Sequence, residues 1–286
     1  MDHAPSYELI DIGEERRLER FGRWSLDRPA PTEGGFARRD PAAWADADAR
    51  FELGDDGSGR WLTIAPDVET PWTALVGGLE FEIRLARSGQ LGCFPEQAST
   101  WFWIAERIAR SALGRTLEVL DLFAHTGGST LAAARAGARV VHVDSARPAL
   151  AWARRNAGLN GLAVAPIRWI ADDVTSFTRR EARRGRRYDG IVLDPPSFGH
   201  GPSGQPWQLA RDLPGLLEAC AAVLADDAGF VVLSAHTPGF DGDRLGSFLA
   251  DALGGFPGGA IETDRLEIES RSGRQLGLGT VARWDR

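Results

Sequence analysis

Cysteine is scarce in this 286-residue chain, which contains only Cys93 and Cys220. Two cysteines are too few for a disulfide framework, and these two lack the close spacing of paired metal ligands. A disulfide-stapled secreted domain and a structural zinc site are therefore not expected. A reducing compartment is the natural one for such a chain, so we predict a cytoplasmic protein without a bound metal.

Long hydrophobic runs are also missing. Nowhere do about eighteen apolar residues follow one another, which is the length that a membrane-spanning helix needs. The first residues, MDHAPSYELI, lack the basic region and apolar core of a signal peptide. We therefore expect neither a membrane span nor a signal peptide.

Positive charge is not in excess. The chain has 33 Lys and Arg against 40 Asp and Glu, which gives a formal net charge of -7. This charge provides no global positive field for a polyanion, and it counts modestly against nucleic acid. The length and the 43% of hydrophobic residues are enough for one sizeable core and a smaller second one.

The N-terminal third is typical of short strands. Apolar runs such as YELIDIG and LEFEIRLA are broken by Gly, Pro and Asp. Leu79, Phe81, Ile83 and Leu85 alternate with more polar residues, as in a half-buried strand. The tryptophans of this region favour packing over base stacking. We predict a small β-rich N-terminal domain over residues 1–97.

Strands alternate with helical patterns through residues 98–286. Apolar runs end at Asp144, at Asp172 and Asp173, and at Asp194, and two last strands lie near ETDRLEIES and LGLGTVARW. The alternation predicts an α/β fold with a doubly wound, Rossmann-like, mostly parallel seven-stranded sheet. The final pair of strands implies an antiparallel edge.

The stretch LEVLDLFAHTGGSTLAAARA, residues 117–136, runs from a buried strand through two glycines into an alanine-rich helix. Thr126, Gly127 and Gly128 put backbone with little side chain at the carboxyl end of the strand. Open α/β sheets bind ligands at this end, and a helix N-terminus offers unpaired N–H groups there. A tight turn without a ligand has the same pattern, so the loop alone is a weak signal.

Carboxylates follow the next strands. Asp144 lies about twenty residues after the glycine loop, a spacing that suits an acceptor for both hydroxyls of a ribose. A cap of the helix that begins near Pro148 is the alternative role for Asp144. A ribose acceptor at this position fits any adenosine-containing cofactor.

The segment Asp194-Pro195-Pro196-Ser197-Phe198 indicates the kind of substrate that would bind here. Two prolines fix φ and remove two donors, which leaves a stiff wall whose carbonyls only accept. Asp194 and the Pro195 carbonyl could orient an amino or ring N–H while Phe198 covers a planar face. The wall suits a flat, donor-bearing substrate. A phosphate-binding loop of the GxxxxGKS/T kind is absent.

In this order, DLFAHTGGST, HVDSA, ADDV and DPPSF resemble motifs one to four of class I S-adenosylmethionine (SAM)-dependent methyltransferases. The resemblance covers roughly residues 91–286 and includes GQLGCFPEQ before the first motif. It is closer to the branch that contains the large-subunit rRNA methyltransferases for cytosine C5 and guanine N7. The resemblance implies a methyltransferase that uses SAM and releases S-adenosylhomocysteine (SAH).

The resemblance also implies roles by position. The cofactor-binding set that it implies is Phe123, Ala124, His125, Thr126, Gly127 and Gly128 for the methionine part, Asp144 and Ser145 for the ribose, Asp173 and Val174 for the adenine, and Asp194. Asp194, Pro195 and Phe198 would be catalytic and face the acceptor and the methyl group. His125 stands where family members commonly have tyrosine. Glu96 and Gln97 could close the pocket or form a polar turn.

The acceptor substrate stays open between an RNA base, most naturally in rRNA, and a protein or small molecule. A non-catalytic cofactor-binding module is a third hypothesis, against which the intact DPPSF segment argues. A run of arginines could bind RNA phosphates or form one solvated helix face. The run comprises Arg179, Arg180, Arg183, Arg184, Arg186 and Arg187.

The sequence also limits which atom of the acceptor could be methylated. Cytosine C5 becomes nucleophilic only after a thiolate adds to the ring, and the cytosine branch carries that cysteine just after the fifth strand. Ala235 stands at this position, so we expect a nitrogen or oxygen acceptor. His200 and His236 could act as bases, although Asp194 is the better candidate for orienting the acceptor.

Overall fold

The computed structural model describes residues 6–30, 35–54, 59–63, 65–200 and 204–286. The chain divides into two compact units. Unit 1 comprises Met1–Ala98 and Glu267–Gly277, and unit 2 comprises Ser99–Leu266 and Leu278–Arg286. The predicted ranges 1–97 and 98–286 are continuous in sequence and do not separate Glu267–Gly277 from the second part. Their status as independent domains stays a prediction.

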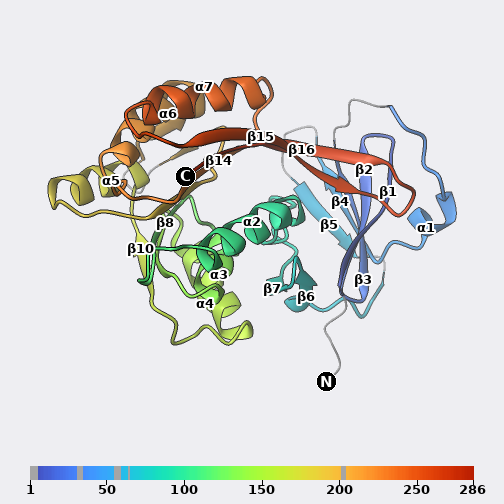
Figure 1. Ribbon diagram of the computed structural model, residues 1–286. Helices are drawn as coiled ribbons and strands as arrows, with labels where there is room; N and C mark the ends of the chain where they lie inside the picture. Colours follow the sequence, from blue (N-terminus) through green and yellow to red (C-terminus); the bar gives the residue numbers. More distant parts are fainter. Residues whose placement is uncertain (1–5, 31–34, 55–58, 64, 201–203) are drawn as a thin grey trace. The chain divides into compact units, whose positions relative to one another are not determined.

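Unit 1 is built from short strands, as predicted for the N-terminal region. A five-stranded sheet has the order β1-β2-β3-β4-β5, in which only β3 and β4 are parallel. Its strands are β1 (Tyr7–Gly13), β2 (Arg16–Phe21), β3 (Trp24–Pro29), β4 (Ala49–Leu53) and β5 (Gly59–Thr63). The helix α1 (Pro41–Ala45) precedes β4, and the hairpin of β6 (Trp72–Val76) and β7 (Leu79–Ile83) follows β5 (Figure 1).

Side chains of unit 1 pack as the patterns indicated. Leu79, Phe81 and Ile83 are buried while Glu80 and Glu82 are partly exposed, so the alternation predicted for this strand is confirmed. Three indole N–H groups donate to the protein itself, whereas that of Trp24 is buried with no acceptor among the described residues. Trp44 bonds the Asp11 carboxylate, Trp61 the Ala86 carbonyl and Trp72 the Phe21 carbonyl.

The predicted seven-stranded sheet belongs to unit 2, except that its two last strands continue into Glu267–Gly277 of unit 1. Its order is β10-β9-β8-β11-β14-β16-β15, with parallel pairing from β10 to β14 and antiparallel pairing of β14 with β16. The strands are β8 (Glu118–Leu122), β9 (Arg139–Asp144), β10 (Ile167–Ala171), β11 (Gly190–Leu193), β14 (Phe230–Ala235), β15 (Ala260–Glu269) and β16 (Gln275–Asp285). The doubly wound, Rossmann-like α/β fold with an antiparallel edge is therefore confirmed.

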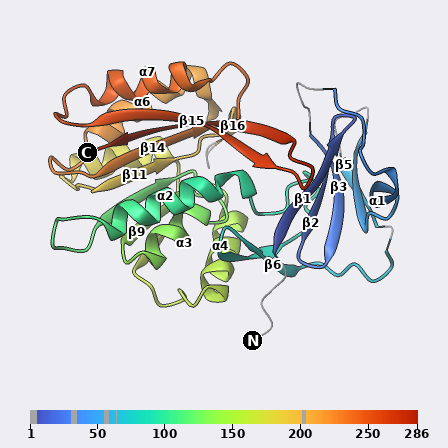
Figure 2. The ribbon, with the colours of Figure 1, turned by 45° about the vertical axis from the view of Figure 1, so that its right-hand side comes forward.

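Helices cover both faces of this sheet, α6 and α7 on one and α2 and α3 on the other (Figure 2). The 3-10 turn η1 (Pro95–Gln97) leads into α2 (Ala98–Ala109). The remaining helices are α3 (Gly128–Arg135), α4 (Arg147–Leu159), α5 (Val174–Arg183), α6 (Leu209–Ala221) and α7 (Gly242–Leu253). Within the described residues, no helix is both long and apolar enough to cross a membrane.

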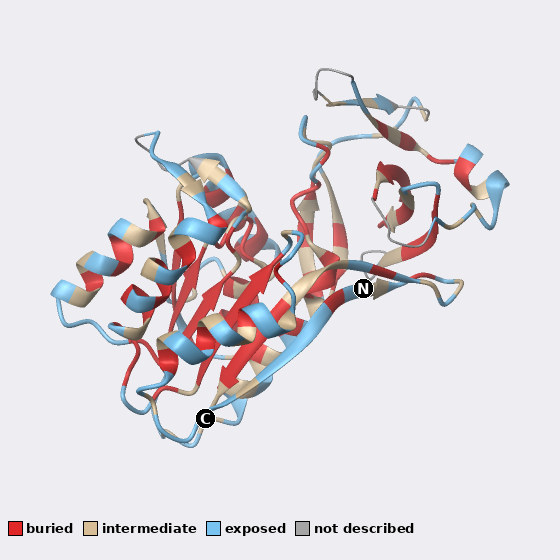
Figure 3. Cartoon of the chain, turned by 90° about the horizontal axis from the view of Figure 1, so that it is seen from above, coloured by how far each residue is buried: buried red, intermediate tan, exposed pale blue. Residues whose placement is uncertain are grey.

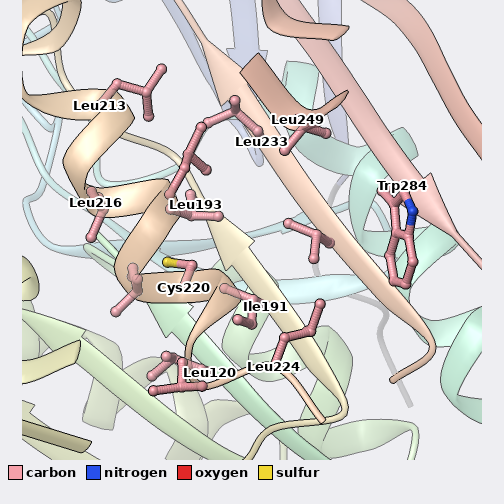
Figure 4. Packing of buried hydrophobic residues seen from close by; sticks show 14 of the residues in the cluster. Leu120, Ile191, Leu193, Leu213, Leu216, Cys220, Leu224, Leu233, Leu249 and Trp284 are labelled. Carbon is pink, nitrogen blue, oxygen red and sulfur yellow. The ribbon is translucent and has the colours of Figure 1, made fainter. Parts of the chain in front are cut away.

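The period of two along each strand divides the core between the two faces. Ile191 and Leu193 of β11 belong to the cluster formed with α6 and α7, and Cys220 of α6 lies beside them (Figure 4). Val192, between them in the chain, belongs to the cluster that includes Ile104 of α2. The central strands are consequently buried on both sides (Figure 3), which explains their unbroken apolar runs.

The first residue of β11 tests this packing. Gly190 pairs with Phe230 of β14, and a Cβ at position 190 would lie 2.3 Å from the Phe230 ring. We expect Gly190→Ala to lower the free energy of unfolding by about 1–3 kcal/mol through overpacking. Gly158→Ala in α4 is the matched control, because nothing lies within 4 Å of its Cβ position. The control should raise stability by roughly 0.5–1 kcal/mol in urea unfolding; equal effects of the two changes would contradict the packing argument.

Candidate functional site

The loop from β8 to α3 is held in a strained conformation. Phe123 and His125 have positive φ values of 56° and 46°, and Gly127 has a φ of 92°. Glycine adopts such angles freely, whereas other residues in this region carry strain of about 1–3 kcal/mol each. The strain is maintained by bonds to β9: Ala124 N–H donates to the Val143 carbonyl, and His125 N–H donates to the Asp144 carboxylate.

Asp144 joins this loop to the start of α4. Its Oδ2 accepts from His125 N–H at 2.8 Å, and its Oδ1 accepts from Ala146 N–H at 2.7 Å. Ala146 is the N-cap residue of α4, so Asp144 lies two residues before the N-cap and accepts from the N–H of the cap residue; it is not itself the helix cap. An ionised carboxylate has about four acceptor positions, so these bonds leave acceptor capacity for a ligand. Ser145, the next residue, is half-buried.

Thr126 and Gly128 are fixed by the protein itself. The side-chain amide of Asn156 donates a hydrogen bond to the carbonyl of the buried Thr126 at 2.9 Å. A Cβ at Gly128 would lie 2.4 Å from the Trp101 ring of α2. Glycine at 128 is thus required by packing against an indole, and the space beside its Cα is not available to a ligand.

A buried polar chain lies beneath the loop, and the sequence analysis missed it. The Thr130 hydroxyl lies 2.5 Å from Asp121 Oδ2 and 2.8 Å from His142 Nδ1, and all three residues are buried. Burial raises the pKa of Asp121 to about 7 against the opposing Thr130 hydrogen bond, and the negative charges of Asp194 and Asp144 add to the increase. Burial likewise lowers the pKa of His142 to about 3. One signal was visible in the sequence: a charged residue and a histidine interrupt the otherwise apolar runs VLDLF and VVHVD.

Asp194 follows β11 at the carboxyl edge of the sheet. Its Oδ1 accepts from the Ser234 hydroxyl at 2.6 Å and lies 3.2 Å from His236 Nε2. Asp194 and Asp144 both act electrostatically on Asp121, and both oppose the burial that lowers the pKa of His125. Two of the predicted strand-end carboxylates, Asp144 and Asp194, thus lie close enough to the buried Asp121 to interact with it.

The two prolines after Asp194 have different surroundings. The Pro196 carbonyl accepts from Trp207 Nε1 at 2.8 Å, while Pro195 is buried. Trp207 was not singled out from the sequence, because it lies eleven residues beyond Pro196 with no local pattern linking them. Its ring lies 5.0 Å from that of Phe123, so it also packs against the loop that follows β8.

Phe198 begins a short hairpin of β12 (Phe198–His200) and β13 (Pro206–Gln208). Its side chain is 73% exposed. Ser197, just before it, shares a hydrogen bond of 2.6 Å with Thr237 after β14. The His200 side chain, considered as a base, lies outside what the structure describes.

The acidic pair after β10 has local partners. Asp173 is the N-cap of α5 and accepts from Ser176 N–H at 2.8 Å, while Asp172 pairs with Arg180. The Val174 side chain is buried in the core. One Asp173 oxygen is therefore engaged by the helix, and any ligand contact from Val174 has to come from its backbone.

Part of the arginine run is neutralised within unit 2. Glu181 is buried and accepts from Arg184 at 2.9 Å and from the Tyr188 hydroxyl at 2.9 Å. Arg187 donates to the Arg186 and Ala222 carbonyls. Among the described residues, no carboxylate pairs with Arg179 or Arg183, which are exposed one turn apart on α5.

Neither cysteine is an available nucleophile. Cys93 and Cys220 are free and buried, and burial raises the pKa of each thiol. Ala235, at the position of the expected cysteine, is buried at the end of β14. In the part of the chain that the structure describes, no three His, Cys, Asp or Glu side chains group as metal ligands.

The Asp121 carboxyl predicts a pH dependence of stability. Its pKa is about 7 in the folded chain against an ordinary value of 3.8, so the folded state holds a proton that the unfolded state releases. The stabilisation is present below about pH 4 and is lost as the pH rises to about 7, at about 1.4 kcal/mol per pKa unit. Asp121→Asn should lack this fall and exceed the native chain in stability at pH 8. Urea unfolding of both proteins from pH 4 to 8 measures this difference. Parallel curves of stability against pH for the two proteins would contradict the assignment.

Comparison with known proteins identifies the family of this chain. A family model described as S-adenosylmethionine-dependent methyltransferase matches residues 41–233. A SAM-dependent methyltransferase from Agrobacterium tumefaciens, a solved structure, has 36% identity and a TM-score of 0.92, over 100% of this chain and 92% of that one. Another solved methyltransferase, in complex with SAH, shares the fold at 18% identity and a TM-score of 0.78, over 99% of this chain and 76% of that one.

Curated relatives match over shorter stretches. Ribosomal RNA large subunit methyltransferase I of Aeromonas salmonicida is 40% identical over 103 residues, which are 35% of this chain and 26% of the relative. Ribosomal RNA large subunit methyltransferase K of Neisseria meningitidis is 31% identical over 178 residues, 62% of this chain and 46% of the relative. The chain thus spans less than half the length of either relative. The family match itself covers most of the chain: this protein belongs to the SAM-dependent methyltransferase family.

Proposed function

We propose that this methyltransferase transfers the methyl group of SAM to a nitrogen or an oxygen of an RNA base, and that rRNA is its substrate. The observation that carries the proposal is the Asp194 carboxylate, fixed at the carboxyl edge of the sheet by Ser234 and His236 while no thiolate is available. The rRNA methyltransferase names of the curated relatives support RNA as the acceptor class.

The proposed cofactor site follows the carboxyl edge of the sheet. The backbone of residues 123–128 would lie along the methionine part, and the remaining acceptor positions of Asp144, with Ser145 beside it, would hold the ribose. The Asp173 oxygen that does not cap α5 would accept from the adenine amine, next to the Val174 backbone. The fit rests on the donors and acceptors present: strained loop backbone, a buried carboxylate with spare acceptor capacity, and no metal-type cluster in the described part.

The chain's own contribution to the reaction is alignment. SAM supplies a methyl group on a positively charged sulfur, and an in-line displacement of this kind needs no metal. Asp194 would accept a hydrogen bond from the acceptor N–H and so aim the nitrogen lone pair. The Pro195 carbonyl would accept a second N–H from the acceptor. After transfer, the nitrogen loses its proton to a nearby acceptor, for which Asp194 is the candidate.

Arg179 and Arg183 are the proposed phosphate contacts of the arginine run. Their exposure and the absence of a paired carboxylate in the described residues leave their charges available, whereas Arg180 and Arg184 are bonded to Asp172 and Glu181. An Arg guanidinium matches phosphate geometry with two parallel hydrogen bonds. Contacts of this kind make binding sensitive to salt.

Labelling decides the acceptor class. Incubation with radiolabelled SAM and separate pools of ribosomal subunits, tRNA, protein and metabolites should place the label in rRNA. The double variant Arg179→Glu/Arg183→Glu should lower labelling of RNA, and added salt should do the same. Label confined to protein or metabolites would overturn the RNA proposal. With 5-fluorocytosine-containing RNA we expect no stable protein–RNA adduct, because C5 chemistry needs a thiolate.

Asp144 should control cofactor affinity. Asp144→Ala removes an acceptor from the ribose and loosens the bonds to His125 and Ala146. We expect a loss of about 1.5–3 kcal/mol in SAH binding, measured by calorimetry. Asp172→Ala, which removes a strand-end carboxylate bonded to Arg180, is the control and should bind normally. Unchanged affinity in Asp144→Ala would remove the ribose assignment.

Asp194 should control turnover and leave cofactor binding intact. In Asp194→Ala the acceptor nitrogen loses its orienting partner, so kcat should fall on the order of 100-fold or more. SAH affinity should stay near that of the native enzyme, because the proposed cofactor contacts come from residues 123–128, 144–145 and 173–174. A parallel loss of affinity and turnover would show that Asp194 serves the cofactor.

A further inference from the structure

His236 is held between two groups that only accept hydrogen bonds. It directly follows β14, and its Nδ1 lies 2.7 Å from the Leu278 carbonyl of β16. Its Nε2 lies 3.2 Å from Asp194 Oδ1. A carbonyl oxygen cannot donate, so the Nδ1 position must carry a proton.

This arrangement fixes the number of protons in the pair. A neutral imidazole has one N–H, which the Leu278 carbonyl already takes. A hydrogen bond between His236 and Asp194 therefore needs one further proton. The Ser234 hydroxyl donates to the same carboxylate oxygen at 2.6 Å, which favours the ionised carboxylate and places the shared proton on Nε2. Without that proton, a nitrogen lone pair would face a carboxylate oxygen.

The position of the ring depends on a glycine of β16. A Cβ at Gly279 would lie 2.9 Å from His236 Nδ1 and 2.6 Å from the Ala235 carbonyl. Any other residue at 279 would push β16 away from the ring. The side chains of both His236 and Asp194 are 32% exposed, so the shared proton can exchange with solvent.

We propose that His236 is a positioning residue for methyl transfer: its protonated ring holds Oδ1 of Asp194, so that Oδ2 is presented to the acceptor nitrogen. The inference rests on the proposed role of Asp194 and adds to it a dependence on one proton. Ser234 donates to Oδ1 from one direction, and the protonated His236 ring donates to the same oxygen from another. Two donors from different directions define its plane.

Because the ring of His236 must be protonated to hold Asp194, turnover should depend on pH. Among the contacts of the ring with described residues, the charged group is Asp194, which follows β11; β14 contributes the Ser234 hydroxyl and β16 the Leu278 carbonyl, neither of which titrates. Asp121 and His125 lie close enough to act electrostatically on Asp194. An adjacent carboxylate favours protonated His236. The fixed geometry is therefore present at lower pH and is lost as the pH rises and Nε2 gives up its proton, so kcat should fall on the alkaline side.

A first test needs no substrate. NMR spectra of the histidine rings, recorded against pH, follow the protonation of His236 in the native enzyme and in Asp194→Asn, with the His236 signal identified by its loss in His236→Gln. We expect the proton affinity of the ring to fall about tenfold or more in Asp194→Asn, since an opposite charge within hydrogen-bond distance is removed. Identical titration in the two proteins would overturn the proposal.

A second test uses turnover on the RNA pool that accepts label. His236→Ala should lower kcat on the order of 10-fold to 100-fold through misalignment, with SAH affinity unchanged. His236→Gln keeps a donor for Oδ1 but cannot titrate, so it should recover part of kcat and lose the alkaline fall. Ser234→Ala is the matched control: it removes the other donor to Oδ1, lowers kcat and keeps the alkaline fall.

The outcomes separate this inference from the proposed function. An alkaline fall in His236→Gln like that of the native enzyme, or a normal kcat in His236→Ala, would refute the role of His236 while RNA methylation stands. If no RNA pool gains label, the proposed acceptor is wrong, and the NMR titration by itself decides whether Asp194 and His236 share the proton.

Discussion

The Asp144 carboxylate is the interaction on which the candidate site depends. It receives the N–H groups of His125 and Ala146, so it ties the β8–α3 loop to the start of α4. Two non-glycine residues of that loop have positive φ, a conformation that persists only where surrounding bonds enforce it. The same carboxylate is the proposed ribose acceptor, so loop geometry and cofactor recognition are coupled through one side chain.

Negative charge concentrates where the parallel strands end. Asp144 and Asp194 act on the buried Asp121, whose pKa rises to about 7 mainly through burial. A cationic sulfonium near this edge would meet attraction from these carboxylates, whereas the neutral product SAH would meet less. The electrostatics of the edge therefore suit a cofactor that loses its positive charge during the reaction.

Asp194 directly follows β11 and is held by residues of the neighbouring strand β14 and its end. Its partners Ser234 and His236 come from β14 and the residue after it, and His236 is seated by Leu278 and Gly279 of the antiparallel β16. The antiparallel edge thus supports the proposed acceptor position. A site placed on paired strands keeps its geometry better than a site on loops, which is what alignment of a nitrogen with a methyl group demands.

The sequence by itself determined the α/β class, the seven strands and the carboxylates after the strands, because period-two and helical patterns are local and parallel strands end at one edge. It also showed that no cysteine follows the fifth strand. Only the tertiary structure decided which atoms those carboxylates bind: Asp173 caps α5, Asp172 pairs with Arg180, and Asp194 meets His236. The buried chain from Asp121 through Thr130 to His142 joins residues 9 and 12 positions apart, and the contact of Trp207 with Pro196 joins residues 11 positions apart. His236 and Leu278 are 42 positions apart. No local pattern encodes such pairings.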